Sequence, residues 1–298
     1  MFHTALMPFL AILRYELRSL RASWLVRLWF IASLLLTLLW LAASWATVPT
    51  VILIAAMLSP YLIFPWFIPV MILGISPVTG SRLDALADGI LSRPITRHEY
   101  LGACWAARVI IVLAVYLVVM APAAALAALA QRPTAPDPVT LYGMVSALCL
   151  VGLVLTFLVT LGFLAGTYMR GPLVAAVVLI FGWFAINLFL HNFALEAFSS
   201  VSLNQALPTV LRKPWRTENA VAEQAVRQED LETLSRTGDA FLSVLSGKRP
   251  APAPKPPAPF FEKGHYEDFA LWRVLLGYGV PTLLAFGLAA WCFSRRDL

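Results

Sequence analysis

Charged side chains are scarce in this chain. Asp, Glu, Lys and Arg make up 13% of its 298 residues, about half of the share that is usual in soluble domains. Hydrophobic residues make up 60%, which is more than a soluble domain usually carries. This balance excludes an ordinary soluble protein and predicts an integral membrane protein.

Cysteine and histidine are also few, and they are widely scattered. All three cysteines fall within apolar runs: Cys104, Cys149 and Cys292. The histidines are His3, His98, His191 and His265. Because neither set has the spacing of metal ligands, the pattern favours small core or lipid-facing cysteines over a redox or metal role.

The motifs of common catalytic sites are absent from the sequence. There is no GxxxxGK[ST] phosphate loop, so the chain does not bind and hydrolyse ATP in that manner. HExxH is absent, and so is a GxS-type nucleophile turn beside a membrane-embedded histidine. An intramembrane hydrolase is disfavoured because no nucleophile–base pair can be assembled. The sequence therefore predicts a non-catalytic protein that binds no cofactor directly.

What the chain does have is a set of long apolar runs, each exceeding the roughly 20 residues that a helix needs to cross a bilayer. They cover residues 24–47, 51–75, 101–130, 139–167, 173–198 and 269–293. The predicted fold class is an all-α integral membrane protein with six transmembrane helices. The predicted domains are a transmembrane part over 1–198, an external segment over 199–268, and a sixth span with a cytoplasmic tail over 269–298.

The segment before the first span, residues 9–21, is amphipathic. Its leucines share one helical face, and its arginines lie on another. These residues are Leu10, Leu13, Leu17 and Leu20, and Arg14, Arg18 and Arg21. The pattern is typical of a helix in the headgroup layer, with its apolar side down and its arginines facing anionic lipid.

The arginines beside the spans predict the orientation of the chain. They gather before the first span, between the second and third, between the fourth and fifth, and after the sixth, whereas the opposite short turns hold only Arg132. By the positive-inside rule both termini are expected in the cytoplasm. The same arginines explain the formal net charge of +6. No basic stretch is interleaved with base-stacking aromatics, so nucleic acid is not an expected partner.

The second apolar run carries three prolines, Pro60, Pro65 and Pro69. A proline inside a helix frees a backbone carbonyl and bends the helix. In a bilayer such a bend persists only where neighbouring helices or water satisfy the freed groups. The prolines predict either kinked packing or a moving gate that lines a pathway.

Polar residues gather near the end of the fifth run. Ionisable groups within spans usually face the interior of a bundle or a cavity. The residues are Asn187, His191, Asn192 and Glu196. Two roles are open for them: interhelical hydrogen bonding with interfacial anchoring, or contact with a substrate.

The long segment 199–268 is expected outside the membrane, since segments of this length do not follow the charge rule. Within it, residues 217–245 favour a helix or helix pair. Residues 248–259, KRPAPAPKPPAP, favour an extended proline-rich spacer. Candidates for contact with an external partner are Arg212, Trp215 and Arg216.

Residues 82–102, between the second and third runs, form a compact charged segment. Its first part favours a short amphipathic helix. Ser92-Arg93-Pro94 ends that helix, and Thr96 with Glu99 has the spacing of a capping box for the next one. A rigid helix–break–helix of this kind is suited to being moved by a soluble partner at the bilayer surface. The alternative is an ordinary solvated loop between spans.

These residues resemble the permease subunits of type 2 ABC transporters. Residues 91–102, LSRPITRHEYLG, are similar to the family's cytoplasmic LSRPxxRxEYxxGK segment between spans two and three. Residues 293–298, FSRRDL, are similar to its terminal FxRRDL, and the amphipathic start and the six spans also fit the family. The sequence departs from the family at Asp84-Ala85-Leu86, where ExxGT is usual, and at Ala103, where Lys is usual.

The resemblance implies two permease copies and two copies of a cytoplasmic ABC ATPase, which binds ATP and Mg²⁺. It implies that residues 82–99 form the coupling helix that docks in a cleft of the ATPase. The length of the external segment resembles permeases that work with an external accessory protein. The residues expected to contact the ATPase are Arg82, Asp84, Leu86, Asp88, Ile90, Leu91, Arg93, Pro94, Arg97 and Glu99.

A second hypothesis is a membrane anchor or assembly scaffold. Such a protein would display residues 199–268 to an external partner without transporting anything. The proline-rich spacer and the basic-aromatic stretch 212–216 motivate this alternative. The two hypotheses differ in what happens when residues 217–259 are deleted, since a scaffold would lose all function.

Overall fold

The computed structural model describes residues 2–75, 97–133, 139–169, 171–192, 199–213 and 271–294. By their contacts the residues divide into two compact units, Met1–Arg212 with Phe269–Leu298, and Lys213–Asp268. All of the helices described belong to the first unit. The helix predicted over 217–245 and the proline-rich spacer predicted over 248–259 lie outside the described residues.

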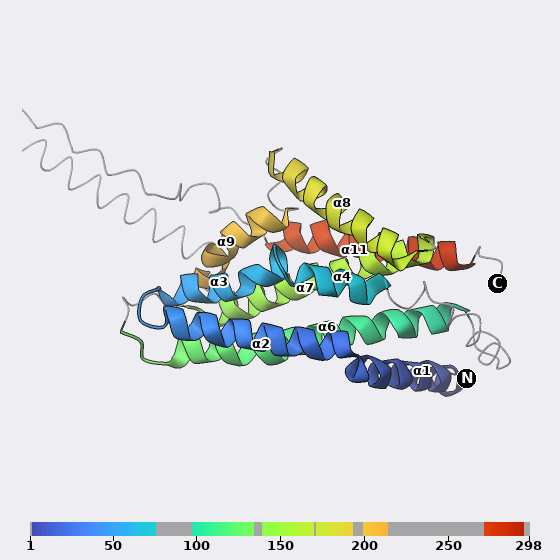
Figure 1. The fold of residues 1–298 in the computed structure, drawn as a ribbon, viewed down its shortest axis with the longest axis horizontal. Helices are drawn as coiled ribbons and strands as arrows, with labels where there is room; N and C mark the ends of the chain where they lie inside the picture. Colours follow the sequence, from blue (N-terminus) through green and yellow to red (C-terminus); the bar gives the residue numbers. More distant parts are fainter. Residues whose placement is uncertain are drawn as a thin grey trace, which may run out of the picture. The chain divides into compact units, whose positions relative to one another are not determined.

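Within the described ranges the chain folds into helices and contains no strand (Figure 1). These helices are α1 (Phe2–Ala22), α2 (Trp24–Ser44), α3 (Thr50–Leu62), α4 (Phe67–Ile75), α6 (Arg97–Leu129), α7 (Leu141–Tyr168), α8 (Pro172–Asn192), α9 (Ser200–Arg212) and α11 (Leu271–Ser294). The prediction of an all-α protein is confirmed for this part of the chain.

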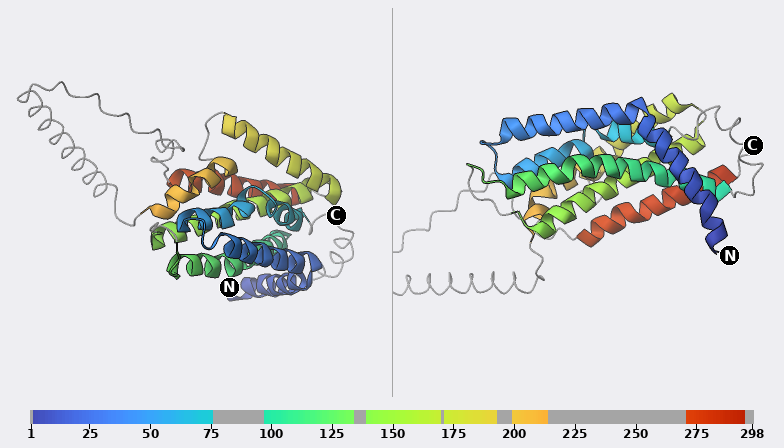
Figure 2. Two further views of the ribbon diagram at one scale, coloured as in Figure 1. Left: turned by 60° about the vertical axis from the view of Figure 1, so that its left-hand side comes forward. Right: turned by 90° about the horizontal axis from the view of Figure 1, so that it is seen from below.

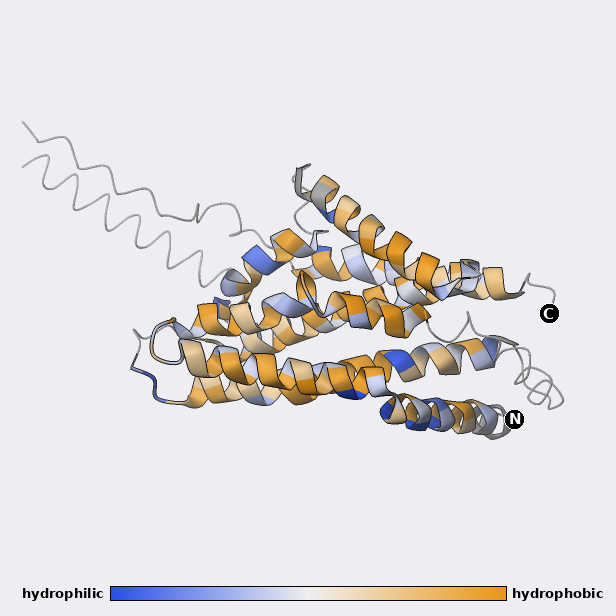
Figure 3. Cartoon of the chain, in the orientation of Figure 1, coloured by the Kyte–Doolittle hydropathy of each residue, from blue (hydrophilic) through white to orange (hydrophobic). Residues whose placement is uncertain are grey.

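Five apolar segments are long enough to cross a bilayer. They are Trp24–Ser44, Thr50–Ile75, His98–Leu129, Leu141–Tyr168 and Leu271–Ser294. Figure 3 shows that these helices are hydrophobic over most of their length, whereas α1 mixes hydrophilic and hydrophobic residues. The chain is therefore a multi-pass membrane protein, as predicted. A further apolar stretch in α8, Pro172–Asn187, is shorter, so the sixth span remains a prediction.

The long helices run side by side and alternate in direction along the chain (Figures 1 and 2). One end of this bundle carries α1, the start of α6 and the end of α11, and the other end carries the α2–α3 turn and α9. We call these the α1 end and the α9 end. α7 makes the most extensive contacts of the described helices, mainly with α4 and α11 and also with α3, α6, α8 and α9. It forms the centre of the unit.

Small residues bring α4 and α7 into backbone contact. A Cβ atom on Gly74 of α4 would lie 2.5 Å from the carbonyl oxygen of Val159, and one on Gly162 of α7 would lie 2.5 Å from that of Met71. One turn further along α7, a Cβ on Gly166 would lie 2.7 Å from the carbonyl oxygen of Ile75. Glycines allow this close approach, which is a common way to pack helices in membranes.

The second predicted span is broken into α3 and α4 around its prolines. Pro60 lies within α3, and Pro65 follows a cis peptide bond in the connection between the two helices. The amides of Ile63 and Trp66 donate to the carbonyls of Ser59 and Pro60, at 3.0 and 3.1 Å. These two carbonyls of the break are therefore satisfied locally. The bend predicted from the prolines is a full interruption of the helix.

The N-terminal amphipathic helix packs on protein with most of its apolar face. Leu20 of α1 is buried, and Leu13 and Leu17 pack against the same hydrophobic core, while Leu10 remains exposed. α1 contacts α6 most extensively and α2 to a lesser degree. The sequence predicted an amphipathic helix whose apolar side meets lipid, but most of that side meets α6.

A second amphipathic helix, α9, follows α8 at the α9 end. It packs mainly against α3 and α7, and its buried apolar residues are Leu203, Ala206, Leu207, Val210 and Leu211. No element was predicted from the sequence for residues 200–212, which belong to the segment 199–268 that is expected outside the membrane. In the structure they pack on the bundle, and the boundary between the two units follows Arg212.

Candidate functional site

The most unusual group in the described bundle is a buried arginine, Arg108, on α6. Its side chain is 4% exposed. Its Nε donates to the carbonyl oxygen of Leu73 at 3.1 Å, and its Nη1 donates to that of Cys104 at 2.6 Å. Its Nη2 lies 3.5 Å from Oε2 of Glu16, whose side chain is 16% exposed. We call these four residues the Arg108 cluster.

The position of each partner of Arg108 follows from its place in its own helix. Leu73 lies in the last turn of α4, where carbonyl groups have no donor within their own helix. Cys104 lies one turn before Arg108 on α6, so its carbonyl oxygen is within reach of the guanidinium. Glu16 lies on the face of α1 that packs against α6. The cluster therefore ties three helices together at the α1 end.

Burying the positive charge of Arg108 costs free energy unless the charge is paired and hydrogen-bonded. The rigid fork of the guanidinium suits several acceptors at once. Removing one partner of a buried ion pair typically costs about 3–5 kcal/mol, since the other charge is left uncompensated. Arg108 and Glu16 are therefore expected to act as a unit.

Trp105, in the same part of α6, contacts both α7 and α11. The indole Nε1 of Trp105 donates to Oγ1 of Thr160 on α7 at 3.0 Å. The ring of Trp105 also lies 4.8 Å from the ring of Phe286 on α11, measured between centroids. Trp105 and Arg108 together connect α6 to four other helices.

The predicted ATPase-coupling residues fall almost entirely outside the described residues. This holds for Arg82, Asp84, Leu86, Asp88, Ile90, Leu91, Arg93 and Pro94. α6 begins at Arg97, one residue after the predicted cap Thr96, which is itself outside the described part. Glu99 lies in the first turn of α6 and is half-buried. The structure thus describes the helices on either side of residues 76–96.

Of the polar residues predicted near the end of the fifth run, Asn187 is described with its side chain. It is 5% exposed. Its Oδ1 accepts from the amide and the hydroxyl of Ser200 at 2.9 and 2.8 Å, and its Nδ2 donates to the carbonyl of Trp183 at 2.9 Å. These contacts join α8 to the first residue of α9. For Asn187 they match interhelical bonding, the first of the two predicted roles.

The remaining predicted residues are placed only in part. The backbones of His191 and Asn192 end α8, while their side chains and all of Glu196 lie outside the described residues. Arg212 is exposed at the last position of α9, and Trp215 and Arg216 lie outside the described part. The structure does not bring Asn187 and Arg212 together with the Arg108 cluster, which lies at the opposite end of the bundle.

Arg132, which entered the sequence analysis only as a lone basic residue, makes a dense set of contacts at the α9 end. Its guanidinium donates to the carbonyl oxygens of Ser44, Trp45 and Val48 at distances between 2.6 and 3.1 Å. It also donates to the hydroxyl of Thr50 at 3.3 Å. Arg132 therefore connects the end of α6 to the α2–α3 turn.

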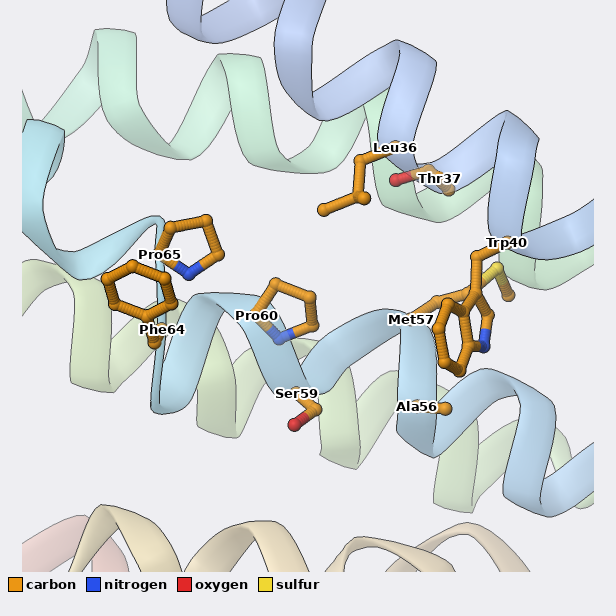
Figure 4. A pocket seen from close by; sticks show the side chains of 9 residues that line it. All are labelled: Leu36, Thr37, Trp40, Ala56, Met57, Ser59, Pro60, Phe64 and Pro65. Atoms are coloured by element: carbon orange, nitrogen blue, oxygen red, sulfur yellow. The ribbon is translucent and has the colours of Figure 1, made fainter.

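A cavity of about 270 Å³ lies between α2 and the broken end of α3 (Figure 4). Its lining carries no charged residue and consists of Leu36, Thr37, Trp40, Ala56, Met57, Ser59, Pro60, Phe64 and Pro65. Thr37 and Met57 are buried, whereas Trp40 and Phe64 are exposed. Because Pro60 has no amide hydrogen, the carbonyl of Ala56, which lines the cavity, loses its usual helical donor. The cavity suits an apolar group.

Neither member of the buried ion pair was among the predicted site residues, although the sequence carries a signal for each. Arg108 is the one charged residue between positions 100 and 131, and Glu16 is the one acidic residue before Asp84. Ionisable residues within spans usually have a partner in the bundle. Reading the two isolated residues together would have suggested the pair.

The described residues contain no cluster of histidine, cysteine, aspartate and glutamate that could hold a metal ion. The three cysteines are free thiols. Comparison of the chain with protein-family models and with curated proteins gives no match. The functional argument therefore rests on the residues and on their arrangement.

Proposed function

We propose that the chain is the membrane subunit of a type 2 ABC transporter. In this role it couples ATP hydrolysis by a separate cytoplasmic ATPase to substrate export or to force transmission across the membrane. The proposal is supported by the multi-pass helical bundle, by the absence of an ATP-binding motif from the sequence, and by the segment LSRPITRHEYLG at 91–102. The subunit itself is non-catalytic, and ATP and Mg²⁺ belong to its partner.

The proposed topology places six spans in a bacterial inner membrane, with α8 as the core of the fifth. Both termini and the α1 end then face the cytoplasm, in keeping with the arginines on that side. The functional unit would contain two copies of this chain and two ATPase subunits. An external accessory protein would meet the unit formed by Lys213–Asp268.

The observation that carries the proposal is the Arg108 cluster. α4 ends at Ile75 and α6 begins at Arg97, so these two helices flank the predicted coupling segment. Arg108 binds the last turn of α4 to α6 through a charge-assisted hydrogen bond. Because the helices on both sides of the segment are joined, a displacement of residues 76–96 would move both together. This is the mechanical property that a coupling segment requires.

The cavity beside the helix break favours transport over the scaffold alternative. A scaffold needs no space inside its membrane part, whereas a transporter must admit or guide at least part of its cargo. The cavity lies beside the end of α3, where the second span is interrupted before α4 begins. The scaffold remains the second candidate, because α9, the helix that precedes the second unit in the chain, packs against α3 and α7.

A pull-down of tagged protein in detergent tests the proposal. The expected result is co-purification of an ATPase subunit, and loss of that subunit when Leu86, Ile90 and Leu91 are all replaced by Asp. The apolar side of the coupling segment should carry most of the docking, because single surface ion pairs contribute little.

The matched control places three Asp residues at Leu231, Leu234 and Phe241 in the external unit, which leaves the cytoplasmic side unchanged. This control should retain the ATPase. Both variants must elute as single species on size exclusion, so that misfolding is not mistaken for lost docking. Retained ATPase binding and ATP turnover in the Leu86, Ile90 and Leu91 variant would refute the assignment of the coupling segment.

A further inference from the structure

We propose that Glu16 and Arg108 form a positioning pair through which α1 moves together with α4 and α6. Through this pair, α1 would become a third helix of the coupling region. The other two are α4 and α6, which flank residues 76–96. The source of the movement, a partner ATPase, rests on the proposed function. The attachment of α1 by the pair is a property of the chain alone.

The geometry of the guanidinium is the first reason for this inference. Its three nitrogens are divided among three helices, since Nε binds Leu73 of α4, Nη1 binds Cys104 of α6 itself, and Nη2 faces Glu16 of α1. A shift of any one helix relative to the other two must lengthen one of these contacts. The arginine therefore favours movement of the three helices as one body.

The other contacts of α1 do not hold it in one position as firmly. Leu13, Leu17 and Leu20 supply apolar packing, and hydrophobic burial is non-directional. At the start of α6, Gly102 leaves room for Phe9, whose ring would lie 3.8 Å from a Cβ atom at that position. The ion pair adds a directional contact nearly two turns further along both helices.

The distribution of charge on α1 is the second reason. Glu16 is the one acidic residue in positions 1–83, and it is turned toward Arg108. The exposed face of α1 then carries Arg14, Arg18 and Arg21, which suit the anionic headgroups of the adjacent leaflet. With its basic face outward, α1 presents its single carboxylate to the bundle. Glu16 is thus placed to attach α1 to the bundle through Arg108.

The attachment can be measured in the isolated chain, in nanodiscs of phosphatidylcholine and phosphatidylglycerol. Cys104, Cys149 and Cys292 are replaced by Ala, and spin labels are placed at Ser19 of α1 and Ile110 of α6, both of which are exposed. We expect one narrow distance distribution in the parent protein. Glu16→Gln should lose it in favour of a broad distribution, because it removes the charge and keeps the size of the side chain.

The matched control is Arg18→Gln, which also changes one charge on α1 but leaves the Arg108 cluster intact. Its distance distribution should remain narrow. Arg108→Lys provides an independent variant, because it keeps the positive charge but has a single nitrogen that cannot reach three helices. It should also broaden the distribution. If Glu16→Gln remains as narrow as the parent protein, the positioning pair is refuted, whatever the chain's partner.

A second measurement follows the movement itself, in the complex with the co-purifying ATPase. Labels at Ser19 and Ile110 are each paired with one at Leu283 on α11, which is exposed, and distances are compared without nucleotide and after vanadate trapping with ATP. Both distances should shift in the parent complex, and Glu16→Gln should lose the shift at Ser19 while keeping that at Ile110. An equal shift at Ser19 in parent and variant would overturn the inference. Absence of the ATPase would instead count against the proposed function.

Discussion

Two arginines at opposite ends of the bundle act through the same chemistry. Arg108 donates to the carbonyl of Leu73 in the last turn of α4, and Arg132 donates to carbonyls at and after the end of α2. The last carbonyls of a helix lack donors within the helix, and the bilayer supplies no water to replace them. In this chain the missing donors are the N–H groups of a guanidinium that is distant in the sequence.

We predict that Arg132→Gln destabilises the protein by about 1.5–3 kcal/mol, the usual value for hydrogen bonds to charged groups. Gln is shorter and has a single amide group, so it cannot reach Ser44, Trp45 and Val48 together. Thermal unfolding in detergent, followed by tryptophan fluorescence, should show a midpoint lowered by several degrees.

The control for this prediction is Arg27→Gln. Arg27 donates one hydrogen bond, from Nε to the carbonyl of Arg21, in an exposed position. Its substitution should shift the midpoint by less than that of Arg132. Equal shifts in the two variants would show that the contacts of Arg132 add nothing to stability beyond its charge.

At the scale of elements, α4 is divided from α3 by the proline-containing break and packs closely against α7. The proline-containing break releases α4 from the helix that precedes it, while Gly74, Gly162 and Gly166 hold its backbone against α7. Arg108 adds the connection to α6. Consequently α4 is joined to the two long helices beside it, α6 and α7.

This arrangement predicts opposite effects for two Gly→Ala substitutions in helices. Gly162→Ala should destabilise the protein, because the new Cβ would lie 2.5 Å from the carbonyl oxygen of Met71, a backbone atom that cannot rotate away. Gly279→Ala should be neutral or stabilising by up to about 1 kcal/mol, since nothing lies within 4 Å of its added Cβ and Ala is the better helix former.

The unfolding midpoints of the two variants, measured in the same detergent, check this prediction. A Gly162→Ala protein as stable as the parent would mean that α4 and α7 are free to separate. In that case α4 would not be held in place by α7, and the mechanical argument for this region would rest on Arg108 alone.

At the scale of the whole molecule, the chain combines a helical membrane part with a second unit, Lys213–Asp268. Deletion of residues 217–259 distinguishes the two candidate functions. We predict that the deleted protein still stimulates ATP turnover by its partner, because the coupling segment and the Arg108 cluster are retained. ATP hydrolysis in the reconstituted complex is the measurement, and complete loss of activity with normal ATPase binding would favour the scaffold.

Much of the fold follows from local patterns in the sequence. Runs of apolar residues predicted the long helices within a few residues of their observed ends, as for 139–167 and α7. The prolines predicted a bend in the second run, where the structure has an interruption between α3 and α4, and the spacing of leucines and arginines predicted the amphipathic helix α1. The site was less predictable: Asn187, one of the polar residues singled out, is buried and hydrogen-bonded in the bundle, whereas Arg108 and Glu16 were overlooked.

The sequence by itself determined that this is a multi-pass membrane protein, that its long apolar runs form helices in the part of the chain that the structure describes, and that the second run bends at its prolines. These properties depend on hydrophobicity, helical period and proline geometry, which act over a few neighbouring residues. Only the tertiary structure decided that Glu16 meets Arg108, that Asn187 meets Ser200, and that α9 lies in the bundle. Such pairings depend on which helix faces come together, and the energy that selects them arises from packing between residues far apart in the chain.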